Sequence, residues 1–597
     1  MAKKSWKKKI GIGILVWILL NVAAIALFFF FSFYGSEKKL HILEEQIMET
    51  AGQNKEITGS YDESLAVVCD NGTFVGKEQN GVRSYRGIPY AESPTGSLRW
   101  KPPVDAGKDA GVYEAYYYGK SNIQTPVASE RSSLYIQGED CLTLNVWTSG
   151  TDSAEDAAPK PVMVFIHGGA YGWGGTADPI YDGQNFVEAH NDVVLVTINY
   201  RIGLMGFVDF SEVPGGEEFK YSGNLGLLDQ ISALRWVNRN IAAFGGDPSC
   251  VTIFGESAGA SSVSFLPLID EAKGLFQRVI AQSGSVAFSF SREEGRSLTE
   301  KLLEETGAKT MDDLMALTEA ELMKVNKKLN DYNNFPERDG IVLPDDLFAE
   351  YASGKAADID MMTGTNADEA RYWIDEVGGI APYVLAAPLM YGSTLERIDE
   401  EDRPYADAFI ELQGGDDTWS ETEFFNEMFF RAPAIKQAEL HAESGGKHYM
   451  YYWTKPSDIE YYGACHAVEL AYVFNNTEDT IYIGKPADKA LASVVQEMWV
   501  NFAKTGDPST PEYKWERYDE TDRKTMILGD DIHMEEDPMP QQRILTEPLL
   551  KYRFNGYFNV VEYSIMYLRR RIRRAALVLL GINIVAFSVR WFLKRQK

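Results

Sequence analysis

A serine between two glycines is the first residue whose surroundings suggest chemistry. Ser257 lies in the pentapeptide 255–259, with the sequence G-E-S-A-G. An apolar stretch, 251–254, precedes the pentapeptide, and small residues continue after it to position 262. This pattern is typical of a nucleophile elbow, a tight strand-to-helix turn that exposes the serine hydroxyl above a sheet. A structural serine in a glycine-rich turn is the alternative, and the pentapeptide alone does not exclude it.

A second glycine-rich segment could supply the electrostatic part of the same reaction. The apolar run 161–166 leads into the segment 167–171, with the sequence H-G-G-A-Y. Because these residues are small, their backbone N–H groups can come within about 3 Å of a negatively charged oxygen. A plain turn after a strand is the alternative. The two segments together predict acyl transfer through Ser257.

Longer motifs resemble the type-B carboxylesterase family, which includes cholinesterases, mammalian carboxylesterases and bacterial para-nitrobenzyl esterases. The matching segments are 85–90 (Y-R-G-I-P-Y), 139–147 (E-D-C-L-T-L-N-V-W), 223–230 (G-N-L-G-L-L-D-Q), 244–248, 251–260 and 499–508. They occur in the family's order and span about residues 65–540. The resemblance implies an α/β-hydrolase fold, with a mostly parallel central sheet and helices on both faces. It also implies hydrolysis of carboxylic esters with no cofactor and no metal.

The resemblance further implies a catalytic triad in the order Ser, Glu, His. Ser257 would attack the ester carbonyl, His466 would accept its proton and return it to the leaving alcohol, and Glu369 would orient the imidazole. Glu369 ends the segment 364–369 (G-T-N-A-D-E), and His466 follows G-A-C in a stretch that matches the family's histidine loop. Asp368 is the alternative acid.

The family's oxyanion hole corresponds to the backbone amides of Gly169, Ala170 and Ala258. Two other histidines in the second half of the chain, His441 and His448, lack the family's context and flank a polar, glycine-rich turn. We therefore expect both of them at the surface.

Two departures from the family concern the cysteines and the substrate. Many members pair the cysteine at Cys141 with one upstream, where this chain has Asn122, so we expect no structural disulfide. Arg131 stands where cholinesterases carry the tryptophan that binds the choline ammonium. Because a guanidinium repels an ammonium, we expect neutral esters to be preferred over acylcholines. Tyr171 and Trp173 are expected either to shape the acyl pocket or to pack in the core.

The elements that must position these residues have the pattern of an α/β protein. Continuous apolar runs at 161–166, 193–198 and 251–254 are typical of strands buried on both faces of a sheet. Residues 228–241 have helical periodicity, and the turn sequence G-G-D-P follows at 245–248. Alternating strands and helices predict a mostly parallel sheet. We expect residues 61–550 to form this one large domain.

The N-terminus has the composition of a membrane anchor. Residues 10–34 form an apolar run of 25 residues after five lysines. As a helix it would be about 37 Å long, enough to span a bilayer core of about 30 Å. The lysines place the N-terminus in the cytoplasm and the remainder outside the cell membrane. We expect residues 1–36 to be a basic tail and transmembrane anchor and 37–60 a stalk; a cleaved signal peptide is the alternative.

The C-terminal segment 551–597 is basic and hydrophobic. Five arginines in 569–574 precede an apolar stretch of 15 residues, 575–589. If the large domain is outside the cell, a spanning helix would leave these arginines on the wrong side of the membrane. A helix that lies on anionic lipid satisfies them better. A second span, or a helix bound to a partner, is the alternative.

The composition limits the choice of partners. Lys and Arg number 58 and Asp and Glu 87, a net charge of −29, so nucleic-acid phosphates would be repelled. Four cysteines in 597 residues exclude a scaffold built on disulfides. We interpret the chain as a membrane-anchored serine carboxylesterase whose partners are a small ester and membrane lipid. A non-catalytic adhesion or scaffold protein of the same fold, resembling the neuroligins, is the alternative, and a lipase or peptidase is another; the complete set of candidate catalytic residues favours the esterase.

Overall fold

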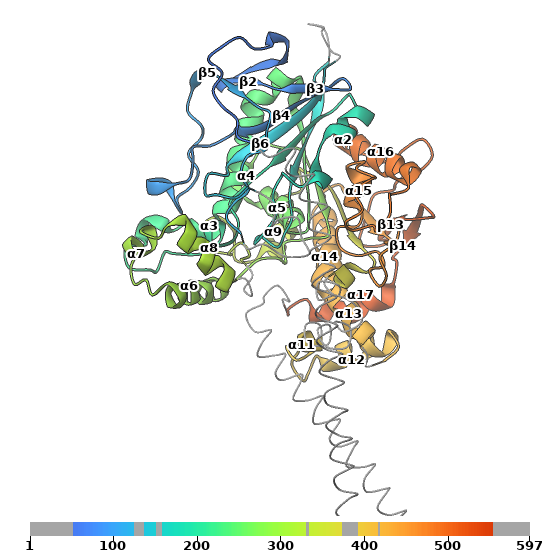
Figure 1. The fold of residues 1–597 in the computed structure, drawn as a ribbon. Coiled ribbons are helices and arrows are strands. Elements are labelled where there is room, and N and C mark those ends of the chain that lie inside the picture. Colours follow the sequence, from blue (N-terminus) through green and yellow to red (C-terminus); the bar gives the residue numbers. More distant parts are fainter. Residues whose placement is uncertain are drawn as a thin grey trace, which may run out of the picture.

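A mixed sheet of 11 strands runs through the molecule (Figure 1), in the order β14-β13-β12-β11-β10-β9-β7-β8-β6-β4-β3. The computed structural model describes residues 52–124, 136–150, 158–329, 334–372, 392–415 and 418–552. The strands are β3 (Lys77–Gln79), β4 (Val82–Pro89), β6 (Thr143–Ser149), β7 (Lys160–Ile166), β8 (Val194–Ile198), β9 (Gly246–Glu256), β10 (Arg278–Gln282), β11 (Asp360–Asn366), β12 (His448–Trp453), β13 (Lys524–Leu528) and β14 (His533–Glu536).

The central part of this sheet is parallel. From β13 to β8 in the sheet order, every pair of neighbouring strands is parallel. The pairs at the two edges, β13 with β14 and β8 through β6 and β4 to β3, are antiparallel. The mostly parallel sheet predicted from the sequence is therefore confirmed. A separate sheet of three strands, β1 (Ala66–Cys69), β2 (Asn71–Val75) and β5 (Asp109–Glu114), lies beside β4.

The central strands are apolar on both faces because helices cover both sides of the sheet. On β7, Val164 belongs to the core cluster that includes residues of α4 (Leu225–Asn240) and α5 (Ala258–Phe265). Its neighbour Phe165 points to the other face, where the core is shared with α2 (Gln184–Ala189), α15 (Leu470–Val473) and α16 (Lys489–Thr505). This alternation explains the continuous apolar runs, since each fully buried large apolar side chain stabilises the fold by about 1.5–3 kcal/mol.

The predicted elements that lead to the elbow are present with shifted boundaries. The helix expected at 228–241 is α4, which begins three residues earlier, at Leu225, and ends at Asn240. The turn expected at 245–248 is shorter than predicted. Gly245 adopts a left-handed conformation, with φ 81°, but β9 already begins at Gly246.

The other helices form two groups outside the central layers (Figure 1). One group is α6 (Arg292–Thr306), α7 (Met311–Met315) and α8 (Glu319–Lys328), which share a core with the segment around Leu204. The other group is α11 (Gly392–Leu395), α12 (Arg403–Leu412), α13 (Thr418–Asn426) and α17 (Pro540–Thr546). Between the sheet and the second group lie the π-helix Glu427–Arg431 and α14 (Ala432–Glu443), and α9 (Leu347–Ala352) packs against α14. The short helix α3 (Gly203–Gly206) follows β8.

The segments predicted to contact the membrane lie largely outside the described residues. This holds for the anchor at 10–34, for most of the stalk and for the C-terminal stretch 575–589. Within the described part of the chain, every helix is too short or too polar to cross a bilayer. Asn54, in the last part of the predicted stalk, already contacts the folded domain, because its Nδ2 donates to the carbonyls of Arg86 and Tyr117 at 2.8 and 3.0 Å.

Candidate active site

Ser257 occupies a tight turn between β9 and α5. Its backbone has φ 58° and ψ −119°, a conformation that costs a non-glycine residue about 1–3 kcal/mol. The backbone N–H of Ser257 donates to the carbonyl of Gln282, at the end of the neighbouring strand β10, at 2.8 Å. The neighbouring strand β10 therefore stabilises the turn, and the strained conformation places the serine at the N-terminal end of α5.

The glycines of the pentapeptide are needed because β7 lies very close to this turn. A Cβ at Gly259 would lie 1.9 Å from the carbonyl oxygen of Ile166, and one at Gly255 would lie 2.7 Å from the same oxygen. Neither position has room for a side chain without moving the backbone. The G-x-S-x-G spacing thus reflects close packing of α5 against β7.

His466 is hydrogen-bonded to Glu369 across the ends of two segments far apart in the sequence. The distance from His466 Nδ1 to Glu369 Oε2 is 2.5 Å, and Glu369 is fully buried. The other carboxylate oxygen of Glu369 accepts from the backbone N–H of Asn366 at 2.8 Å. Asp368, the alternative acid, instead binds Arg371 at 2.7 Å and the backbone N–H of Ala464 at 2.8 Å. Of the two candidates, Glu369 is the one that contacts the imidazole.

The second nitrogen of the imidazole faces a carboxylate that the sequence analysis did not consider. His466 Nε2 lies 3.1 Å from Oε1 of Glu256, the residue directly before Ser257. Burial by itself lowers the pKa of His466, but the negative charges of Glu256 and Glu369 outweigh it and raise the pKa to about 9. An imidazole between two carboxylates is therefore a stronger base than a free histidine.

A small cavity of about 50 Å³ brings these groups together. Ser257, His466 and Glu256 line it, as does the segment 168–170. The other residues that line it are Trp173, Gly174, Asp178, Tyr181, Tyr372, Ala467 and Tyr482. The cavity thus combines the candidate nucleophile, base and oxyanion loop with largely aromatic walls.

The candidate oxyanion hole has backbone amides without partners. In the regions that the structure describes, the N–H groups of Gly169, Ala170 and Ala258 donate no hydrogen bond to another residue. Gly169 has φ 104° and Ala170 has φ 49°, both left-handed. A Cβ at Gly169 would lie 2.1 Å from the carbonyl oxygen of Trp173, which explains the glycine. These amides can therefore serve a negatively charged oxygen.

His167 fixes the start of this loop as a neutral residue. Its ring stacks on Tyr200 with 4.5 Å between centroids, and its carbonyl accepts from the Tyr200 hydroxyl at 2.8 Å. Burial lowers the pKa of His167 to about 4, so the ring is uncharged at neutral pH.

The two aromatic residues after the loop have different roles. Tyr171 is fully buried, its hydroxyl lies 3.1 Å from Ser262 Oγ, and its ring packs against Phe207 and Phe335. Trp173 lines the cavity. Core packing thus applies to the first and pocket shaping to the second. Arg131 lies outside the described residues.

The expectation that His441 and His448 are surface residues is wrong. They are 0% and 1% exposed, and their Nδ1 atoms lie 3.1 Å apart. The polar turn between them is only the link from α14 to β12, and the helix packs over the first residue of the strand. Burial lowers the pKa of both histidines, so the pair is neutral.

The cysteines and possible metal ligands add no further chemistry. All four cysteines are free, and Asn122 Nδ2 donates to Cys141 Sγ at 3.3 Å. Across the described ranges, no three His, Cys, Asp or Glu side chains are arranged to hold a metal ion.

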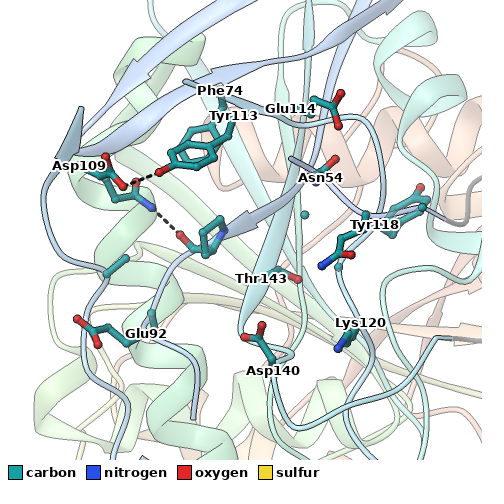
Figure 2. A pocket seen from close by; sticks show the side chains of 18 of the residues that line it. Asn54, Phe74, Glu92, Asp109, Tyr113, Glu114, Tyr118, Lys120, Asp140 and Thr143 are labelled. Carbon is teal, nitrogen blue, oxygen red and sulfur yellow. Dashed lines mark hydrogen bonds between the residues drawn. The ribbon is translucent and has the colours of Figure 1, made fainter. Parts of the chain in front are cut away.

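A larger cavity, of about 780 Å³, lies away from this site, between the three-stranded sheet and the segment 118–120 (Figure 2). Glu92, Asp109, Glu114 and Asp140 contribute carboxylates to its lining. None of the candidate catalytic residues lines it. The chemistry therefore belongs to the smaller cavity.

Sequence reasoning overlooked three buried residues that contact the candidate triad or its neighbours. Glu256 lies in the pentapeptide 255–259, and its position directly before the nucleophile could have indicated a role in the site. Glu469 follows His466 by three residues, and Gln282 ends a strand. Nothing in the local sequence of Glu469 and Gln282 indicates a contact, because their partners are up to 217 residues away.

Comparison with known proteins agrees with this geometry. The profile of the Carboxylesterase family matches residues 63–544. The para-nitrobenzyl esterase of Bacillus subtilis (strain 168) is 34% identical over 503 residues, covering 80% of this chain and 97% of that protein. Neuroligin-3 of Mus musculus is 30% identical over 544 residues, covering 75% of this chain and 63% of that protein.

Solved structures show the same relationship. A crystal structure of a Geobacillus stearothermophilus carboxylesterase has a TM-score of 0.70 and 31% sequence identity, and the alignment covers 81% of this chain and 99% of that one. The predicted α/β-hydrolase fold and the predicted class, a carboxylic-ester hydrolase, are confirmed. The chain belongs to the carboxylesterase family.

Proposed function

We propose that this chain is a membrane-anchored serine carboxylesterase that works through an acyl-enzyme on Ser257. The observation that carries the proposal is the 2.5 Å contact between His466 and Glu369, beside a strained serine in the same cavity. A buried carboxylate on Nδ1 fixes the tautomer that leaves Nε2 available as a base.

Each step uses groups that line the cavity. The carbonyl oxygen of the ester binds to the amides of Gly169, Ala170 and Ala258, and the Ser257 hydroxyl attacks the carbonyl carbon while His466 accepts its proton. The imidazolium then donates that proton to the leaving alcohol. Water repeats the sequence on the acyl-enzyme and releases the acid. Glu369 stabilises the imidazolium in both halves of the reaction.

The substrate is a small neutral ester in this proposal. The aromatic walls of the cavity suit an uncharged group, and one relative is named for para-nitrobenzyl esters. Two carboxylates, Asp178 and Glu256, also line the cavity and would attract a cation. The preference against acylcholines therefore depends on Arg131, whose charge opposes theirs. Comparable kcat/KM values for butyrylcholine and a neutral butyrate ester would refute this part.

The test of the reaction is hydrolysis of a panel of p-nitrophenyl acyl esters by the full-length chain in detergent. The Ser257→Ala variant should lose at least about 10³-fold in kcat, because triad residues act as a unit. Ser249→Ala, an exposed serine on the same strand, is the matched control and should retain activity. Full activity of Ser257→Ala would refute the proposal. An inactive but folded wild type would favour the adhesion alternative.

We further propose that residues 10–34 anchor the protein with the hydrolase domain outside the cell membrane. The support is the apolar run and the lysines that precede it. Deletion of residues 1–35 should release much of the enzyme from membranes. Any fraction held by 569–589 should be released by salt if that segment only lies on anionic lipid, at about 1 kcal/mol per basic residue. Protease added to intact cells or spheroplasts should digest the hydrolase domain; survival of the domain until lysis would show the opposite orientation.

A further inference from the structure

A buried carboxylate joins the ends of two neighbouring strands, β10 and β11, beside the candidate catalytic residues. Glu469 is fully buried, three residues after His466. Its Oε1 accepts from Gln282 Nε2 at 3.0 Å, and its Oε2 accepts from Asn366 Nδ2 at 2.7 Å. Both donors are amide N–H groups, and an ionised carboxylate can accept one of them on each oxygen. The two hydrogen bonds therefore favour the ionised form.

One partner of Glu469, Asn366, connects it to the acid of the triad, Glu369. Asn366 is the last residue of β11, and its backbone N–H donates to Glu369 Oε1 at 2.8 Å. Its side-chain Nδ2 also donates to the carbonyl of Cys465 at 2.9 Å. One asparagine thus positions both Glu369 and the residue directly before His466, and Glu469 fixes its side chain.

The other partner of Glu469, Gln282, connects it to the nucleophile, Ser257. Gln282 is the last residue of β10, and its carbonyl accepts the backbone N–H of Ser257 at 2.8 Å. Its side-chain Oε1 accepts from Trp499 Nε1 at 3.1 Å. Glu469, Gln282 and Trp499 are all fully buried, so no water competes for these hydrogen bonds.

We infer that Glu469 is a positioning residue of the esterase site: it fixes the Ser257 turn and the Glu369 carboxylate relative to each other and adds negative charge near His466. The inference rests on the proposed function of Ser257, Glu369 and His466. Glu469 does not contact the substrate in this account; it acts through Gln282 and Asn366.

Three ionisable groups surround Glu469: Glu369, Cys465 and Tyr451. Burial and the charge of Glu369 raise the pKa of Glu469 above its usual value, and the hydrogen bonds from Asn366 and Gln282 offset part of that rise. Cys465 and Tyr451 lie nearby, and burial raises the pKa of each well above its usual value, so both are neutral. Glu469 also contributes, after Glu256 and Glu369, to the raised pKa of His466.

The direct test is Glu469→Gln in the full-length chain. A glutamine amide presents one N–H₂ group, which must face the amide donor of either Asn366 or Gln282 and leaves that donor without an acceptor. We expect kcat to fall roughly 10- to 100-fold because reacting groups shift by a fraction of an ångström, with little change in KM. The acid limb of the pH profile of kcat/KM is the range in which activity rises with pH as His466 loses its proton. It should also move to lower pH, since the negative charge of Glu469 is lost.

A second variant separates geometry from charge and remains informative if the glutamine variant does not fold. Glu469→Asp keeps the charge but is one methylene shorter, so it should lower kcat and leave the acid limb in place. The matched control is Glu337→Gln, the same substitution at a carboxyl that is 2% exposed and outside this network. The control should leave both kcat and the acid limb unchanged.

The outcomes distinguish this inference from the proposed function. If the two Glu469 variants have wild-type kcat, or lose only thermal stability, Glu469 has a merely structural role and the inference is overturned. If Ser257→Ala is fully active in the same assay, the proposed function fails. A titration without substrate then still tests the inference: the proton resonance of His466 Nδ1–H should titrate at lower pH in Glu469→Gln than in the wild type, and coincident midpoints would overturn it.

Discussion

Neutralising Glu256 should shift the pH dependence of the enzyme to lower pH. Its Oε1 lies 3.1 Å from His466 Nε2, the nitrogen that must accept the serine proton. With the pKa of His466 raised to about 9, only about 1% of molecules hold a neutral imidazole at pH 7, since each pH unit below the pKa is a factor of ten. The activity of the wild type should therefore rise steeply between pH 7 and 9.

The size of the effect follows from the separation of the charges. Two unit charges about 4 Å apart interact by about 4 kcal/mol at an effective dielectric constant of about 20. This is about three pKa units at about 1.36 kcal/mol per unit. In Glu256→Gln we expect the pKa of His466 to fall by one to three units. The plateau of kcat should fall at least about tenfold, because the imidazolium of the transition state loses at least about 1.4 kcal/mol of stabilisation.

The assay is kcat/KM for one neutral ester, measured by pH-stat between pH 5 and 10. Asp178→Asn is the matched control, because Asp178 is a second carboxylate that lines the cavity. Its acid limb should move less than that of Glu256→Gln. Superimposable acid limbs for Glu256→Gln and the wild type would show that Glu256 does not set the basicity of His466. A limb that moves to higher pH would contradict the electrostatic reasoning outright.

Further predictions concern the triad and the stability of the fold. His466→Ala should lower kcat at least about 10³-fold and Glu369→Gln somewhat less, with unchanged circular dichroism; near-wild-type rates would remove these residues from the mechanism. Burial, aided by the charges of Asp209 and Asp339, raises the pKa of Glu337 from 4.5 to about 8, so the folded protein keeps a proton that the unfolded chain releases above about pH 4.5. The stability contributed by Glu337 therefore falls as the pH rises from about 4.5 to 8. Glu337→Gln should unfold with a free energy higher by up to roughly 3 kcal/mol at pH 7, with a much smaller difference at pH 4.5, and equal stabilities at pH 7 in urea unfolding would contradict this reasoning.

Local sequence patterns predicted the parts of the fold that local physics determines. The runs at 161–166 and 251–254 are buried on both faces, and such strands must be continuously apolar. The pentapeptide at 255–259 predicted the elbow because close approach to β7 excludes any side chain at Gly255 and Gly259. The resemblance to a known family pointed to Glu369 and His466, which no local pattern distinguishes from other acids and histidines.

Burial and long-range contacts were beyond such patterns. His441 and His448 flank a polar turn, yet the packing of α14 on β12 buries both of them. Glu469 depends on strands β10 and β11 ending side by side, so that Gln282 and Asn366 reach it together. That arrangement is a property of the assembled sheet.

Covalent labelling of the full-length protein with an organophosphonate, followed by peptide mass spectrometry, tests directly whether Ser257 is the nucleophile. We expect one adduct per chain, on Ser257, and no labelling of His466→Ala on the same timescale, because the serine is activated by that imidazole. An adduct on any other serine, or labelling that persists in Ser257→Ala, would contradict this expectation.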